Sequence, residues 1–73
     1  MMTNTALLEN KIAQSGLKKG YLAMKLGLSK AGFRNCCTNK AEFKAGQIQI
    51  LCELLDITDL AERQAIFFAN LGA

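Results

Sequence analysis

The sequence predicts an all-α fold: a compact five-helix bundle that forms one domain over residues 1–73. Apolar residues recur at the spacing of helix faces, and most of the six glycines lie where a helix is expected to begin or end. Strongly alternating runs and Asn-Gly hairpin signals are absent, so a β-rich fold is not expected. A chain of this length buries only about 60% of its unfolded surface, so a partner chain would stabilise it.

The first helix is expected over about residues 6–15, with Asn4 or Thr5 as its N-cap and Gly16 ending it. The second is expected over about residues 19–26. It begins poorly, because the preceding lysine is not a favoured cap residue.

A sharp turn is expected between the second and third helices. Gly27 tolerates the positive φ that such a turn requires, and the small Ala23 lets the third helix cross close to the second. Ser29 can cap the third helix, which is expected to run to about Thr38, and Asn39 suits a left-handed helix end.

The fourth helix is expected over about residues 45–55 and the fifth over about 59–70, with Thr58 or Asp59 starting the fifth. Phe43, in the loop before the fourth helix, is expected to fill the core. The residues expected on the buried faces are Leu8, Ile12, Leu22, Leu26, Leu28, Phe33, Cys36, Phe43, Ile48, Leu51, Cys52 and Leu55.

Charge is unevenly distributed along the chain. Seven lysines and one arginine stand against Glu9 and Glu42 in residues 1–44, whereas residues 45–73 carry one arginine and four acidic residues. Six of these cationic residues lie in or beside the second and third helices. This clustering favours a surface that binds a polyanion over a lysine-rich surface that only contacts solvent.

The sequence lacks the residue patterns that catalysis and metal binding usually require. The chain has no histidine, and its three cysteines include one adjacent pair without zinc spacing or an activating base. We therefore expect no enzyme activity, no metal and no cofactor. Cys36 and Cys52 are expected to be small core residues in a reducing cytoplasm, and no apolar run reaches the length of a membrane span.

The outer side of the third helix has the residue types that read DNA. Lys30 or Arg34 can bond guanine, Asn35 can bond adenine through two hydrogen bonds, and Ala31 can touch a thymine methyl group. A phosphate contact is an equal alternative for Arg34.

These residues resemble the helix-turn-helix family of phage Cro proteins and repressors, the Xre-like group. The resemblance covers about residues 8–55, and its most specific part is the run Leu22-Ala23 and Leu26-Gly27-Leu28-Ser29, with Phe33 and Cys36 following. Departures include Lys19, where the family often has glutamine, and Gly32 inside the third helix.

The resemblance implies a lambda-repressor-like fold and a transcription regulator that binds double-stranded operator DNA in the cytoplasm of a bacterial host, without a small-molecule ligand. It places Lys19 at a phosphate-contacting position. Four further residues are expected at phosphates: Ser29, Thr38, Lys40 and Lys44.

The fifth helix has more apolar residues than one inward stripe needs. We therefore expect a homodimer on a palindromic site, with an interface formed by Ile66, Phe67, Phe68 and Leu71. One alternative is that this helix folds fully back onto the body. A second is that the chain is a protein-interaction module, like an antitoxin or anti-repressor, that uses this apolar helix.

Overall fold

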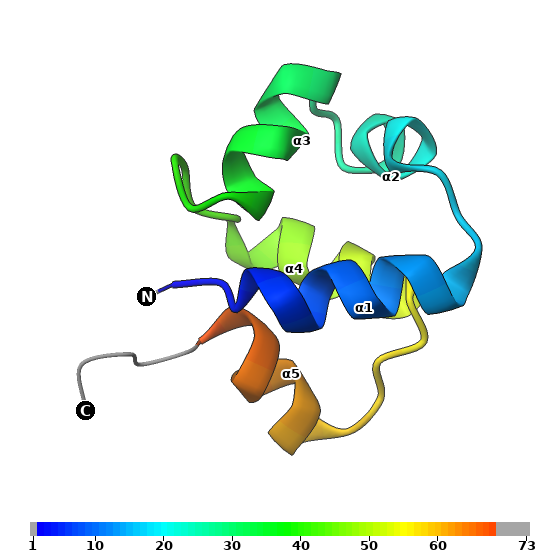
Figure 1. Cartoon of the computed structure of the whole chain (residues 1–73), viewed down its shortest axis with the longest axis vertical. Helices are drawn as coiled ribbons and strands as arrows, with labels where there is room; N and C mark the ends of the chain where they lie inside the picture. The colour runs from blue at the N-terminus through cyan, green and yellow to red at the C-terminus, as the bar shows by residue number, and fades with distance from the viewer. Residues whose placement is uncertain (1, 69–73) are drawn as a thin grey trace.

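The computed structural model describes residues 2–68, which form five helices and contain no strand. The helices are α1 (Thr5–Ser15), α2 (Lys19–Lys25), α3 (Lys30–Cys37), α4 (Ala45–Leu54) and α5 (Leu60–Phe67). The molecule measures 33 × 24 × 20 Å, and α3 and α5 lie toward opposite ends of its long axis, with α1 and α4 between them (Figure 1). The all-α class and the five helices are thus confirmed.

Local sequence sets most of the helix ends. The Asn4 side chain accepts the amide hydrogen of Leu7 at 3.2 Å, and Gly16 ends α1 with φ 73°. Asp59 caps α5 by accepting the amide hydrogen of Ala61. Lys18 makes no side-chain cap at α2, as its residue type predicts.

The connection between α2 and α3 is tight. Gly27 has φ 72°, and the amide of Leu28 donates to the carbonyl of Ala23 at 2.9 Å. Ala23 is buried, and the Ser29 hydroxyl oxygen accepts the amide hydrogen of Gly32 at 3.0 Å. The start of α3 is therefore fixed by a tight turn with a backbone hydrogen bond and by a side-chain cap.

The core contains all the residues predicted to be buried, although Leu28 is only half-buried at its edge. The aromatic ring of Phe43 lies edge-on to both Phe33 and Phe67, with centroid distances of 6.0 and 5.9 Å. The loop after α3 therefore anchors itself in the core through one aromatic residue, which confirms the expectation for Phe43.

The structure corrects the expectation for α5. Ile66 and Phe67 are 1% and 3% exposed within the single chain, so they belong to the core and not to a free interface. They turn inward because Phe43 offers Phe67 an aromatic contact that the local helix pattern does not reveal. Phe68 is 36% exposed and stays available to a partner, whereas Leu71 and the expected extension of this helix to residue 70 lie outside the described residues.

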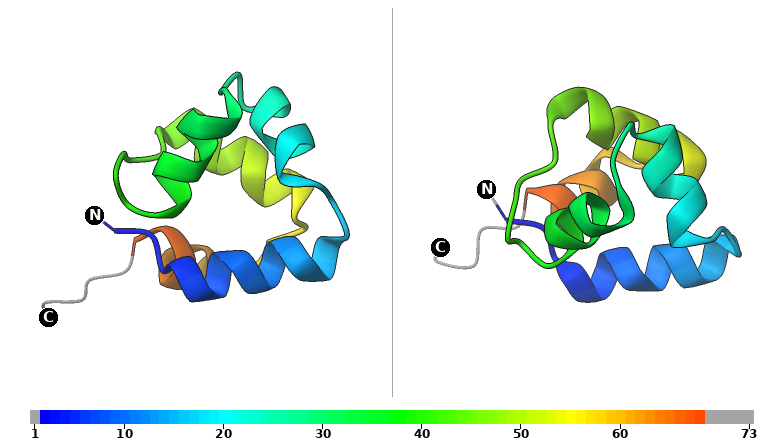
Figure 2. Two further views of the ribbon diagram at one scale, coloured as in Figure 1. Left: turned by 45° about the horizontal axis from the view of Figure 1, so that its top comes forward. Right: turned by 90° about the horizontal axis from the view of Figure 1, so that it is seen from above.

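The segment before α1 ties distant parts of the fold together. Thr3 and Asn39 exchange two hydrogen bonds: the Thr3 amide donates to Asn39 Oδ1 at 2.8 Å, and Asn39 Nδ2 donates to the Thr3 carbonyl at 2.9 Å. The Asn4 amide donates to the carbonyl of Ile66 at 2.6 Å. The two views of Figure 2 both place this segment beside the end of α5.

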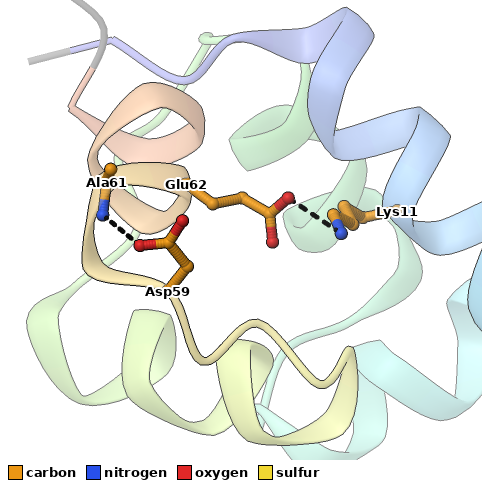
Figure 3. A network of polar contacts seen from close by, with 4 residues as sticks. All are labelled: Lys11, Asp59, Ala61 and Glu62. Atoms are coloured by element: carbon orange, nitrogen blue, oxygen red, sulfur yellow. Dashed lines mark hydrogen bonds and ion pairs between the residues drawn. The ribbon is translucent and has the colours of Figure 1, made fainter.

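A salt bridge joins α1 to α5 on the side away from α3. Lys11 Nζ lies 3.0 Å from Glu62 Oε2, close to the cap that Asp59 forms (Figure 3). Within the described residues no helix combines the length and the apolar character needed to cross a membrane.

Candidate nucleic-acid interface

Helix α3 has one buried and one exposed side. Phe33, Cys36 and Cys37 are buried against the body. The four residues that the sequence assigns to base reading are all exposed: Lys30, Ala31, Arg34 and Asn35. Backbone hydrogen bonds also secure the end of α3, because the amides of residues 40 and 41 both donate to the carbonyl of Asn35. The helix is therefore held at its back while its outer side faces solvent.

The exposed residues of α3, together with its C-cap residue Thr38, divide into two rows. Lys30, Arg34 and Thr38 follow one another at intervals of four and border a cleft of about 410 Å³ between α1, α2 and α3. Ala31 and Asn35 are not among the residues that line it. One row thus faces the cleft and the neighbouring helices, and the other faces away from them.

The end of the Lys30 side chain lies beside Gly20 of α2. A Cβ atom placed on Gly20 would lie 3.1 Å from Lys30 Cε, closer than nine in ten real contacts of this kind. The missing side chain therefore leaves room for the lysine stem to lie against α2. Gly20 and Lys30 both line the cleft that Lys19 also borders.

Lys19 is exposed, but it has a partner that the sequence did not predict. Its Nζ atom lies 2.8 Å from Glu9 Oε1, and both side chains are about half exposed, at 56% and 47%. Both residues line the α1–α2–α3 cleft. The sequence limited the acidic partners for Lys19 in this part of the chain, since Glu9 and Glu42 are the only acidic residues in the first 44 positions.

The other predicted phosphate contacts are also at the surface. Ser29, Thr38, Lys40 and Lys44 are all exposed. The Thr38 hydroxyl donates to the carbonyl of Arg34 at 2.9 Å, so its oxygen can still accept but its hydrogen is engaged. Ser29 uses its oxygen as the cap of α3, which leaves its hydroxyl hydrogen for an acceptor such as a phosphate oxygen.

The cysteines have the properties of core residues. All three thiols are free and buried, and burial raises the pKa of each. For Cys37 burial and then the nearby Glu9 carboxylate raise the pKa to about 11. A protonated thiol is a poor nucleophile and a poor metal ligand. Among residues 2–68 no cluster of side chains could hold a metal ion.

Comparisons with protein-family models, with curated proteins and with solved structures found no match to this chain.

Proposed function

We propose that this protein is a sequence-specific regulator of transcription that binds double-stranded DNA, with α2, its turn and α3 acting as a helix-turn-helix unit. The main support is the position of α3, whose polar and cationic residues are exposed while its back is buried. A helix presented in this way fits the major groove of DNA. The excess of cations in residues 1–44 and the resemblance to phage Cro proteins and repressors point in the same direction.

The two rows on α3 suit two different tasks. Asn35 and Ala31, which lie away from the cleft, would contact base edges: the amide would pair with adenine, and the methyl group would pack against thymine. Lys30 and Arg34 share the cleft with Lys19, and this position favours phosphate contacts for both of them over guanine contacts. Phosphate contacts would set the register in which Asn35 meets its base.

One helix of eight residues reads only a few base pairs. A two-fold dimer would place two copies of α3 about 34 Å apart, one turn of the duplex, and would recognise a palindromic site. Phe68 supports such a dimer, because it is an exposed aromatic residue at the end of α5.

Replacing Asn35 tests the base-reading assignment. In Asn35→Ala we expect discrimination at one base pair of each half-site to fall by roughly 1–3 kcal/mol, because the bidentate contact to adenine is lost. The site is first selected from a random duplex pool. The affinity of each protein is then measured for the selected duplex and for duplexes that carry single base changes.

Asn10→Ala is the matched control, because Asn10 is an exposed asparagine beside the groove between α1 and α5. Its specificity profile should equal that of the wild type. If Asn35→Ala keeps the full profile, α3 does not read bases through this residue.

A protein-interaction module is the second candidate, and the exposure of Leu60 (69%) and Phe68 (36%) on and beside α5 is the observation in its favour. Duplex binding that weakens as salt rises separates the two functions, because a pure interaction module has none.

A further inference from the structure

We propose that the α1–α2–α3 cleft is a binding site for one phosphate of the DNA backbone, and that Glu9 competes with this phosphate for Lys19. The inference rests on the proposed function, since it names a site and a regulating residue for the same DNA. Glu9 would thereby set how tightly the protein holds any duplex, whatever its sequence.

The composition of the cleft fits a phosphate. Lys19 lies at the start of α2, and Lys30 and Arg34 approach from α3, so three cations from two helices border one space. Thr38 adds a hydroxyl oxygen at the same border. Converging ammonium and guanidinium groups bind a phosphate oxygen through charge-assisted hydrogen bonds.

Glu9 differs from the other charged residues of the cleft because it is negative. It is the acidic residue that lines the cleft, it comes from α1, and its carboxylate lies 2.8 Å from Lys19 Nζ. A carboxylate and a phosphate present the same kind of oxygen to a lysine, so the two anions compete for one partner. Because both are negative, Glu9 also repels a phosphate that enters the cleft.

A purely structural role for the Glu9–Lys19 pair would have little effect. Both side chains are about half exposed, and exposed pairs of this kind contribute roughly 0–1 kcal/mol to stability. Removing the charge of Glu9 should therefore leave the fold intact and act on binding. The contribution to binding is also moderate, because water screens both groups.

The experiment compares Glu9→Gln, Lys19→Gln and the double variant with the wild type. Affinities are measured for the selected duplex and for an unrelated duplex, over a series of salt concentrations, and urea unfolding confirms that each variant folds. Glu62→Gln is the matched control, because Glu62 of α5 also pairs with a lysine, Lys11 of α1, and this pair lies away from the cleft (Figure 3). Each single Glu variant changes the net charge by the same amount.

We expect Glu9→Gln to bind both duplexes about three- to tenfold more tightly near 0.1 M salt, with a salt dependence steeper by up to about 0.9 per protomer. Lys19→Gln should weaken both duplexes by a similar factor. In the double variant the gain from the Glu9 substitution should be smaller than in the wild-type background, because without Lys19 only the direct repulsion between Glu9 and the phosphate is relieved. Glu62→Gln should change little.

Two results would overturn the competition: an affinity of Glu9→Gln equal to or below that of the wild type, or an equal gain in Glu62→Gln, which would show an effect of net charge alone. Wild-type protein that binds no duplex at all would instead refute the proposed function, and the phosphate site with it. These failures are distinguishable because the first two require a wild type that binds DNA.

Discussion

Asn39 shows how a single residue can serve both the local backbone and the tertiary fold. It follows α3 in the left-handed conformation, with φ 65°, which asparagine tolerates better than most residues. Its amide group also exchanges two hydrogen bonds with the backbone of the buried Thr3, 36 positions earlier in the chain. The sequence predicted the first role from residue type, but nothing local to Asn39 indicated the second.

Replacing Asn39 separates these two roles. Asn39→Gly keeps the left-handed backbone accessible but leaves the N–H and C=O groups of a buried residue without their partner, so we expect a loss of roughly 1–3 kcal/mol in the free energy of unfolding. Asn39→Ala should lose about 1 kcal/mol more, because alanine is strained at positive φ. Urea denaturation measures both values.

The control for this comparison is Asp56→Gly, since Asp56 is also left-handed, with φ 57°, and is exposed. It reports what a glycine does at such a position without the contact to Thr3. A loss in Asn39→Gly no greater than the loss in Asp56→Gly would mean that the bonds to Thr3 contribute nothing to stability.

At the scale of the helix, α5 depends on its contacts with the rest of the chain. Its spacing of apolar residues is too irregular to show which side faces inward, and the structure settles this through the contact of Phe67 with Phe43. Cutting the chain before α5 would therefore remove core residues and is a poor test of dimerisation. Point substitutions at two adjacent phenylalanines separate folding from association.

We expect Phe67→Ala to lose about 3–5 kcal/mol of unfolding free energy, because Phe67 is 3% exposed and its removal leaves a cavity. That loss approaches the whole stability of a domain this small, so Phe67→Leu serves as a milder variant. Phe68→Ala should stay folded and shift the proposed dimer toward monomer, because the exposed ring would supply apolar contact to the second copy.

Circular dichroism with urea and sedimentation equilibrium measure these two effects. If the wild type sediments as a dimer and Phe68→Ala does so equally, the end of α5 is not part of the interface.

Sequence patterns predicted much of this molecule because they act locally. The i, i+3, i+4 spacing of Ile48, Leu51 and Cys52 identified a buried face correctly, and all nine residues assigned to DNA are exposed, as a binding role requires. What the sequence missed are contacts between elements. The pairing of Glu9 with Lys19 joins two helices, and the end of the Lys30 side chain lies against Gly20 of α2.

At the scale of the whole molecule, the helices that carry the two proposed interfaces lie toward opposite ends of the long axis and are joined by one connecting segment (Figure 1). Thr3 bonds to Asn39 at the end of α3, and Asn4 bonds to the carbonyl of Ile66 in α5. The geometry of the segment links the helix proposed to read DNA with the helix proposed to bind a second copy. Charge follows the same division, since the cations concentrate in residues 1–44 and the acids in the remainder.

This polarity predicts that the position of a charge matters more than the net charge. Lys40 is exposed, and its amide bonds to the carbonyl of Asn35 at 2.8 Å, which places it at the end of α3. Lys11 pairs with Glu62 on the α5 side of α1. In Lys40→Gln one phosphate contact is lost, so the slope of log K against log salt should flatten by about 0.9 per protomer, and by about 1.8 if a dimer binds a palindromic site.

Lys11→Gln removes the same charge and should leave the slope unchanged, because Lys11 does not face the duplex in the proposed orientation. Fluorescence anisotropy with a labelled duplex, measured at several salt concentrations, gives both slopes. An equal flattening in the two variants would mean that the duplex senses only the total charge of the protein, and it would contradict the assignment of the α3 side as the DNA-binding surface. A change near 1.8 in Lys40→Gln alone would support both that surface and the two-fold assembly, since each bound duplex would then lose two phosphate contacts.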